Sequence, residues 1–216
     1  MNLGNLIKFS IFDGLHLALR AYCDDKPNDE WLQVKAKNET AVVRINDFSI
    51  DIGVAGSNDF KDWFDNFRII GTTRSGYGRV PRGFYTNLDR LAPKIMELIK
   101  DHRDKTVTIS GHSRGGAIAF LLAIFLHRQG FRITDIVTFG CPNVGKSNFI
   151  REVKRIKANI RMYKNGSDLI TTLPPFIFGY KKPSRQIQIG KKRWWGTSIE
   201  DHYRESYSRV IQKIES

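Results

Sequence analysis

The sequence has few cysteines, no long apolar run and a shortage of acidic side chains. Cys23 and Cys141 are the only cysteines, too few for a disulfide framework and without zinc-binding spacing. No segment reaches the roughly 18 apolar residues that a membrane-spanning helix needs. Polar Lys8, Ser10 and Asp13 interrupt the first segment, and no small-residue cleavage site follows, so we predict no signal peptide. With its thiols reduced, the protein is predicted to be cytoplasmic.

Basic residues outnumber acidic ones: 35 Lys and Arg against 22 Asp and Glu give a formal net charge of +13. Such a surface attracts polyanions, either nucleic acid or a membrane rich in anionic lipid. The apolar fraction of 41% excludes a disordered chain. Because 216 residues contain no repeat and no low-complexity linker, we expect one domain over residues 1–216.

Apolar patterning predicts strands that alternate with helices. The expected helices cover residues 3–22, 60–70, 88–100, 115–126 and 199–214, and the expected strands cover 41–45, 48–54, 106–109, 133–139, 160–163 and 186–189. The segment 71–78 is expected to be a glycine-rich loop, and Pro93 is expected to break its helix early. This alternation predicts an α/β fold with a mainly parallel sheet and helices on both faces.

The motif Gly111-His112-Ser113-Arg114-Gly115 lies between a predicted strand and a predicted helix. This is the G-x-S-x-G pattern, in which a sharp turn projects a serine hydroxyl clear of the sheet. Strand and helix crowd together two residues before and two residues after the serine, where a side chain would clash. We therefore predict that Ser113 is a nucleophile.

A nucleophilic serine needs a base and a carboxylate that orients the base. Among the five histidines, His202 follows the last predicted strand, where loops converge on the site of an open α/β sheet. Asp168 follows the strand predicted over 160–163 and lies between serine and histidine in the chain, in the order this architecture requires. Asp135 and Asp201 fit less well, because they lie near a strand start and a helix start.

With this trio in view, the chain resembles the class 3 (fungal-type) lipase family of α/β-hydrolases from about Ala18 to Tyr207. Several blocks carry the resemblance through their order and spacing: Val54-Ala55-Gly56-Ser57 before Asp62-Trp63, Val80-Pro81-Arg82-Gly83-Phe84, Ser110 to Ala117, Thr138 to Gly145, Asn165-Gly166-Ser167-Asp168 with Leu173-Pro174-Pro175, and Asp201-His202 with Tyr207.

The resemblance implies an α/β-hydrolase fold with Ser113, Asp168 and His202 as a catalytic triad. It also implies that the backbone N–H groups of Ser57 and Arg114 form the oxyanion hole, and that residues 60–67, with their aromatic face, form a lid. Two residues depart from the family pattern: Arg114 stands where the family has an apolar residue, and Ala55 where it has Arg. A cation beside the nucleophile favours anionic headgroups or pairs with a local carboxylate.

The function we predict is hydrolysis of lipid carboxylic esters through an acyl-enzyme, as a lipase or a phospholipase A, without metal or organic cofactor. The net positive charge of the chain slightly favours a phospholipid as the substrate. A thioesterase or acyltransferase on the same triad stays open, because the motifs do not specify the final acceptor. The sequence does not specify an oligomeric state.

A competing motif is Gly140-Cys141-Pro142-Asn143-Val144-Gly145-Lys146-Ser147, a full match to the phosphate-binding P-loop pattern. Too few residues follow Ser147 for a nucleotide-binding fold, and no Mg²⁺-binding Asp, D-x-x-G or N-K-x-D follows. The P-loop is therefore the minor alternative.

Two segments, Lys181-Lys182 and Lys191-Lys192-Arg193-Trp194-Trp195, combine cations with aromatics. Such segments stack on RNA, bind a membrane surface or form a solvated loop. Beside a lipase site we prefer peripheral contact with an anionic membrane, and no nucleic acid partner is expected.

Overall fold

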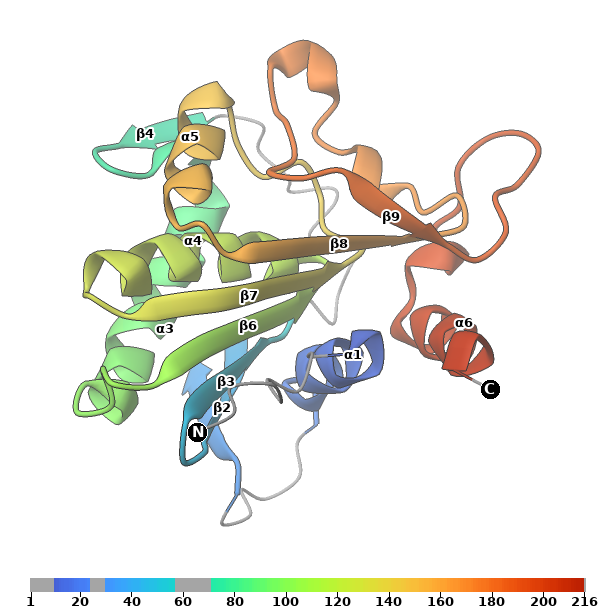
Figure 1. The fold of residues 1–216 in the computed structure, drawn as a ribbon. Helices are drawn as coiled ribbons and strands as arrows, with labels where there is room; N and C mark the ends of the chain where they lie inside the picture. Colours follow the sequence, from blue (N-terminus) through green and yellow to red (C-terminus); the bar gives the residue numbers. More distant parts are fainter. Residues whose placement is uncertain (1–9, 24–29, 57–70, 216) are drawn as a thin grey trace.

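The computed structural model describes residues 10–23, 30–56 and 71–215 (Figure 1). The helices and strands in chain order are α1 (Ile11–Arg20), β1 (Leu32–Ala36), β2 (Glu39–Ile45), β3 (Ser49–Val54), β4 (Gly71–Arg74), β5 (Gly78–Pro81), α3 (Arg82–Ile99), β6 (Thr106–His112), α4 (Arg114–Arg128), β7 (Arg132–Phe139), α5 (Ser147–Arg155), β8 (Asn159–Asn165), β9 (Gln186–Ile189) and α6 (Arg204–Glu215). Three short 3₁₀ helices, η1 (Ile170–Thr172), η2 (Phe176–Phe178) and η3 (Glu200–His202), lie in the later loops.

A seven-stranded sheet in the order β1-β2-β3-β6-β7-β8-β9 forms the centre of the fold. From β3 to β9 the neighbouring strands pair in parallel, whereas β1 and β2 are antiparallel at one edge. The predicted mainly parallel sheet is therefore confirmed. Because parallel strands point the same way, the loops after β3, β6, β7, β8 and β9 all leave from one end of the sheet.

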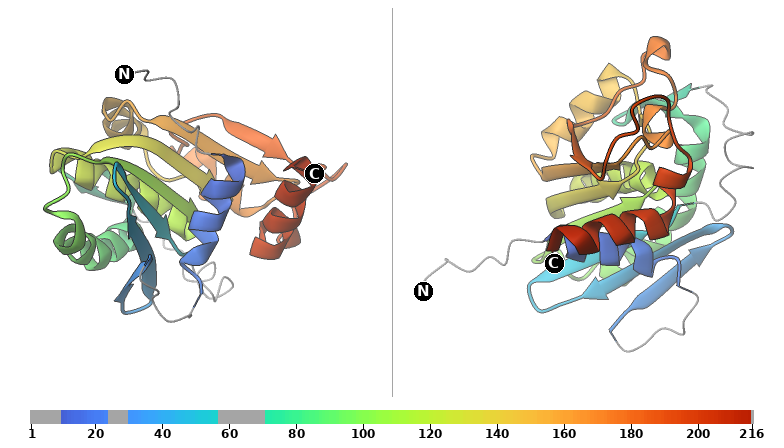
Figure 2. Two further views of the ribbon diagram at one scale, coloured as in Figure 1. Left: turned by 60° about the horizontal axis from the view of Figure 1, so that its bottom comes forward. Right: turned by 90° about the vertical axis from the view of Figure 1, so that its right-hand side faces the viewer.

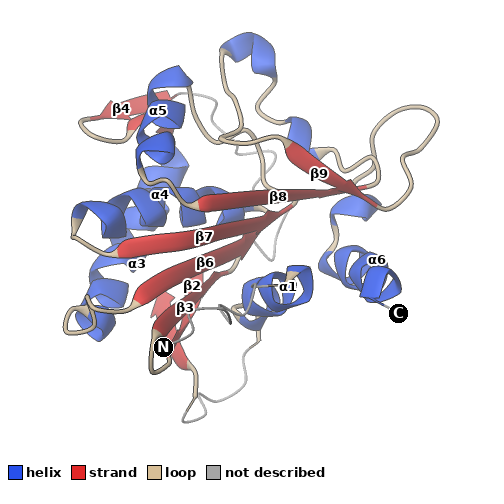
Figure 3. Ribbon diagram, in the orientation of Figure 1, coloured by secondary structure: helices blue, strands red, loops and turns tan. Residues whose placement is uncertain are grey.

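Helices cover both faces of the sheet, as predicted (Figure 3). Helices α3 and α4 pack on one face over the larger apolar core, and α1 and α6 pack on the other face over a smaller one (Figure 2). Helix α4 is apolar on nearly every side, with Phe120, Leu121 and Leu122 fully buried. A helix of that composition is stable only inside the protein, so it packs between the sheet and α3.

Three expectations about elements were wrong. Segment 71–78 is not a loop: Gly71–Arg74 and Gly78–Pro81 form the β4–β5 hairpin. Pro93 does not break α3, which starts at Arg82 and continues to Ile99, because the apolar face that holds Leu91 and Ile95 stays buried while Pro93 is on the exposed side. Strand β1 was not expected, because its sequence has only a weak β-strand pattern. Its pairing with β2 stabilises it as a strand.

Helix α1 lies very close to β3. A Cβ atom on Gly53 would lie 2.1 Å from the backbone oxygen of Leu17 in α1, a distance that no side chain tolerates. On the neighbouring strand, the Ser110 hydroxyl donates a hydrogen bond to the backbone oxygen of Gly14 at 2.6 Å. The glycine and the serine together fix the height and position of α1 on the sheet.

We predict that Gly53→Ala destabilises the protein by about 2 kcal/mol or more, because the added methyl group must push α1 away from the sheet. Gly83→Ala is the matched control, since a Cβ atom there meets nothing within 4 Å. In the exposed first turns of α3 alanine should stabilise by about 0.5 kcal/mol. Urea unfolding of both variants measures the difference, and equal free energies of unfolding would contradict the close approach of α1.

Candidate active site

Ser113 occupies a strained turn between β6 and α4. Its backbone φ and ψ angles are 58° and −130°, a conformation that residues other than glycine rarely adopt. A Cβ atom on Gly111 would lie 2.5 Å from the backbone carbon of Gly115, and one on Gly115 would lie 2.2 Å from the backbone oxygen of Val54. Both glycines of the motif are therefore needed for the close contact of β3, β6 and α4, as the sequence predicts.

The structure brings Ser113, His202 and Asp168 together. The hydroxyl of Ser113 lies 2.8 Å from Nε2 of His202, and Nδ1 of His202 lies 2.9 and 3.0 Å from the two carboxylate oxygens of Asp168. A carboxylate only accepts hydrogen bonds, so Nδ1 carries the proton and Nε2 is left to accept from the serine. This is the arrangement in which a histidine can take a serine proton.

The Asp168 carboxylate is completely buried and fully provided with donors. The Tyr207 hydroxyl donates to one oxygen at 2.7 Å, and the backbone N–H of Ile170 donates to the other at 2.9 Å. Tyr207 in turn accepts from the backbone N–H of Asn165 at 3.0 Å. Burial raises the pKa of Tyr207 well above its usual value, so its hydroxyl stays protonated and keeps donating to Asp168.

The competing carboxylates are used elsewhere. Asp135 lies inside β7, four residues before the end that faces the site, and pairs with Arg161 at 3.0 Å. Asp201 accepts a hydrogen bond from the backbone N–H of Ser167 at 2.7 Å, which holds the turn that carries Asp168. Of the three acidic residues, Asp168 is the one whose carboxylate lies within hydrogen-bond distance of Nδ1 of His202.

Comparison with known proteins gives the family. The model of the family described as Lipase (class 3) matches residues 52–178, more than half of the chain. The chain belongs to the class 3 lipase family.

Two of the curated relatives that this chain matches illustrate the similarity. It is 31% identical over 172 residues to secreted mono- and diacylglycerol lipase 1 of Fusarium solani, covering 76% of this chain and 50% of the relative. It is 28% identical over 202 residues to a secreted mono- and diacylglycerol lipase of Malassezia globosa, covering 80% of this chain and 66% of the relative. The chain thus spans about half the length of the first of these curated relatives.

Solved structures agree with the fold. The triacylglyceride lipase of Rhizomucor miehei superposes with a TM-score of 0.74 at 20% identity, covering 89% of this chain and 91% of that one. Lipase II of Rhizopus niveus superposes with a TM-score of 0.73 at 20% identity and the same coverage. The predicted α/β-hydrolase fold is confirmed.

The comparisons contradict the predicted cytoplasmic location, because several relatives carry the word secreted in their names. The inference from cysteine was unsound for a physical reason. Cys23 is exposed and Cys141 is buried, and both are free thiols, so this fold needs no disulfide in any compartment.

Within residues 10–23, 30–56 and 71–215, no helix has both the length and the apolar composition of a membrane span.

Part of the expected site lies outside the described residues. Ser57, assigned to the oxyanion hole, and the segment 60–67, assigned to the lid, belong to that part. Arg114, the other expected oxyanion donor, is the first residue of α4. Its backbone N–H therefore belongs to the first helical turn, where N–H groups have no partner within the helix.

The structure shows where the Arg114 side chain lies, for which the sequence leaves two alternative partners, an anionic headgroup or a local carboxylate. It reaches back to the β1–β2 turn, where Nη2 lies 3.5 Å from the backbone oxygen of Asn38. Burial lowers the pKa of the guanidinium, and the nearby charge of Glu39 opposes that effect. The Arg114 side chain is thus directed to the β1–β2 turn, where the charge of Glu39 acts on it.

The P-loop alternative does not fit the structure. The backbone N–H groups of Gly140, Asn143, Val144 and Lys146 all donate to carbonyl oxygens of the chain, so they cannot bind a phosphate. Gly140 instead makes room for the site: a Cβ atom on it would lie 2.8 Å from Cε1 of His202.

Among the described residues, no group of three or more His, Cys, Asp or Glu side chains could hold a metal ion.

We predict that Tyr207→Phe costs about 2 kcal/mol of unfolding free energy, because the buried N–H of Asn165 loses its acceptor and Asp168 loses a donor. Tyr203→Phe is the control, since that ring is 50% exposed. Chemical unfolding monitored by circular dichroism compares the two. Equal stabilities would show that the Tyr207 hydroxyl contributes nothing to the buried network.

Proposed function

We propose that this class 3 lipase hydrolyses carboxylic esters of glycerol lipids, with Ser113 as nucleophile, His202 as general base and Asp168 as the residue that orients His202. The observation that carries the proposal is the unbroken series of hydrogen bonds from Ser113 through His202 to Asp168. We also propose that the chain acts as a single catalytic domain, because one sheet supports all three residues.

Acylation begins when Ser113 Oγ attacks the ester carbonyl carbon while its proton moves to His202 Nε2. The buried Asp168 carboxylate stabilises the resulting imidazolium through the Nδ1 proton. When the tetrahedral intermediate collapses, Nε2 gives its proton to the leaving glycerol oxygen. The acyl group stays on Ser113 as an ester.

Deacylation repeats these steps with water as the nucleophile. His202 takes a proton from the water, the hydroxide attacks the acyl carbon, and the fatty acid leaves as Ser113 Oγ recovers its proton. In both halves of the reaction, the backbone N–H groups of Ser57 and Arg114 would donate to the oxyanion. The start of α4 adds its positive helix end to that stabilisation.

Mono- and diacylglycerols are the substrate class we favour over phospholipids. Relatives from Fusarium solani and Malassezia globosa are named mono- and diacylglycerol lipases. The orientation of Arg114 toward Asn38 and Glu39 also weakens the case for an anionic headgroup beside the nucleophile. The same relatives are named secreted, so we propose that this enzyme acts outside the cell.

We expect Ser113→Ala to lower kcat on mono- and diacylglycerols by about 10³-fold or more, because it removes the hydroxyl that lies 2.8 Å from Nε2 of His202. Ser147→Ala, which removes the serine of the P-loop pattern, should retain wild-type rates and still react with a fluorophosphonate. Mass spectrometry of the labelled protein should find the adduct on residue 113. Wild-type hydrolysis by Ser113→Ala would rule out the proposed function, and preference for an acyl thioester would favour a thioesterase.

For the interfacial partner we propose an anionic lipid surface. Two loops, one between β8 and β9 and one after β9, project from the part of the molecule that carries these strands (Figure 1). In η2, Phe176 and Ile177 are 74% and 77% exposed, and in the loop after β9, Trp194 and Trp195 are 92% and 78% exposed. Solvent-exposed Lys191 and Lys192 precede the two tryptophans. Apolar rings with flanking cations are the composition that binds at the headgroup level of anionic membranes.

Replacing Trp194 and Trp195 together by alanine should weaken binding to phosphatidylserine-containing vesicles at least tenfold, because about 0.8 kcal/mol is lost for each buried CH₂ equivalent. Lys191→Gln with Lys192→Gln should remove about 1 kcal/mol per lysine, and only at low salt. Cosedimentation at two salt concentrations measures both effects.

Phe48→Ala is the control for this prediction. Phe48 is 86% exposed, but it lies in the β2–β3 turn, at the opposite end of the parallel strands. Hydrolysis of a water-soluble ester should stay unchanged in all these variants. Vesicle binding by the double tryptophan variant equal to that of wild type, or tighter binding to single-stranded RNA than to vesicles, would refute the membrane surface.

A further inference from the structure

His112 lies directly behind the catalytic pair. The rings of His112 and His202 are 4.9 Å apart between centroids and inclined by 30°. His112 does not reach the serine hydroxyl; its Nε2 lies 2.9 Å from the backbone oxygen of His202. Because a carbonyl oxygen only accepts, Nε2 of His112 carries the proton and donates to the main chain of the general base.

The other nitrogen of His112 is therefore an acceptor. Nδ1 lies 3.0 Å from the hydroxyl of Tyr22, which donates to it. The ring is buried, and burial lowers the pKa of His112 well below its usual value, with the neighbouring His202 acting in the same direction. His112 thus stays neutral, in the one tautomer that satisfies both neighbours.

The Tyr22 hydroxyl makes a second hydrogen bond, to the segment that leads into residue 57. It accepts from the backbone N–H of Gly56 at 2.7 Å. Gly56 is packed against the nucleophile: a Cβ atom on it would lie 2.5 Å from the Tyr22 hydroxyl and 3.0 Å from Cβ of Ser113. One phenol oxygen thereby connects the backbone of Gly56 with His112 and, through His112, with His202.

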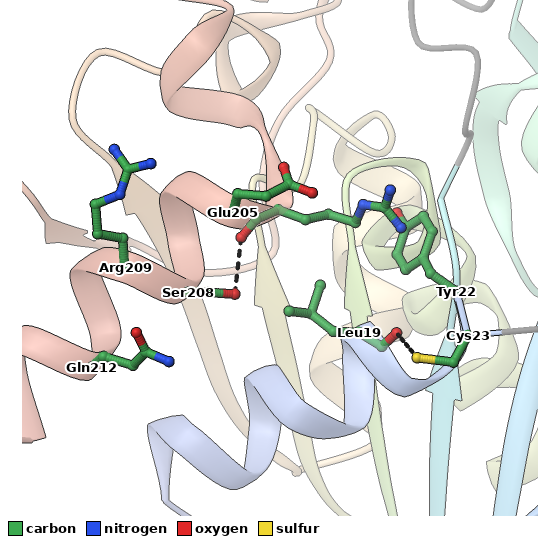
Figure 4. A pocket seen from close by; sticks show the side chains of 8 residues that line it. Leu19, Tyr22, Cys23, Glu205, Ser208, Arg209 and Gln212 are labelled. Carbon is green, nitrogen blue, oxygen red and sulfur yellow. Dashed lines mark hydrogen bonds between the residues drawn. The ribbon is translucent and has the colours of Figure 1, made fainter. Parts of the chain in front are cut away.

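The ring of Tyr22 is fixed from the outside as well. Tyr22 lines a groove between α1 and α6, together with Leu19, Cys23 and residues of α6 (Figure 4). At the start of α6, the Arg204 guanidinium lies over the Tyr22 ring, 4.3 Å from its centroid. Arg204 follows His202 by two residues, so the segment that carries the base also covers the phenol ring.

We propose that Tyr22 and His112 are positioning residues that hold Gly56 and the main chain of His202 in a fixed relation to Ser113. This inference rests on the proposed function, because it concerns the same reaction. Neither residue exchanges a proton with substrate. Each acts by keeping the base and the oxyanion donors where the transition state needs them, and small displacements of such groups reduce rates strongly.

The test uses the full chain and a water-soluble short-chain nitrophenyl ester. Tyr22→Phe should lower kcat about tenfold to a hundredfold and leave KM within about twofold, because donors displaced from the oxyanion weaken the transition state more than substrate binding. Phenylboronic acid, which forms a tetrahedral adduct on serine, should lose affinity by the factor by which kcat/KM falls.

Two variants of His112 separate its hydrogen bonds. His112→Gln retains a donor in the position of Nε2, toward the backbone of His202, and His112→Asn retains an acceptor in the position of Nδ1, toward Tyr22. Each variant should lower kcat at unchanged KM. In the His112→Gln background, Tyr22→Phe should have a smaller effect than in wild type, because only the hydrogen bond to Gly56 is left to lose. These variants decide the proposal if Tyr22→Phe alone does not fold.

Tyr85→Phe is the matched control. Tyr85 is a buried tyrosine in α3 whose hydroxyl donates to the backbone oxygen of Gly78, away from Ser113. It should lose stability with kcat and boronate affinity unchanged. If Tyr22→Phe and both His112 variants behave like Tyr85→Phe, with kcat per folded molecule within about twofold of wild type, the positioning role is refuted. Hydrolysis by Ser113→Ala at the wild-type rate would instead refute the proposed function itself.

Discussion

The site depends on the close backbone approach between the end of β3 and the first turn of α4. Gly115 lies against the main chain of Val54 and Ala55, and Gly111 lies against Gly115, so no side chain fits at either position. This contact fixes the turn in which Ser113 has positive φ. The strain is sustained because α4 is buried along nearly its whole length, so the sheet and the helix cannot separate to relax the turn.

Around that turn, several loops meet because parallel strands end at the same side of the sheet. The loop after β8 supplies Asp168, the segment after β9 supplies His202, and β6 itself supplies His112. Every buried polar group named in this cluster has a partner with complementary donor and acceptor character, from Tyr207 on one side to Tyr22 on the other. A buried network that is satisfied throughout has few alternative arrangements, which keeps the geometry of Ser113 constant.

The central sheet and the turn at Ser113 could be predicted from the sequence, because both have strong local patterns. The strong alternation of apolar strands and helices gave the sheet from β3 to β9, and the glycine spacing around Ser113 gave the turn. Prediction failed where local signal and tertiary packing disagree. Pro93 is a helix breaker in isolation, yet α3 continues through it because its apolar face is buried. The P-loop pattern at Gly140–Ser147 is a complete match, yet four of its N–H groups already donate to carbonyl oxygens of the chain. Cysteine content misled the prediction of location.

By itself, the sequence determined most of the elements that form the central sheet and singled out the serine, the carboxylate and the histidine that we propose as the triad, because periodicity and motif spacing are local properties of the chain. Only the tertiary structure decided that the side chain of Arg114 contacts the backbone of Asn38, and that Tyr22, His112 and Gly56 join the same hydrogen-bonded group as His202. These contacts connect residues far apart in the chain. The direction of a hydrogen bond depends on which donor and acceptor the fold brings face to face, and no local pattern specifies that pairing.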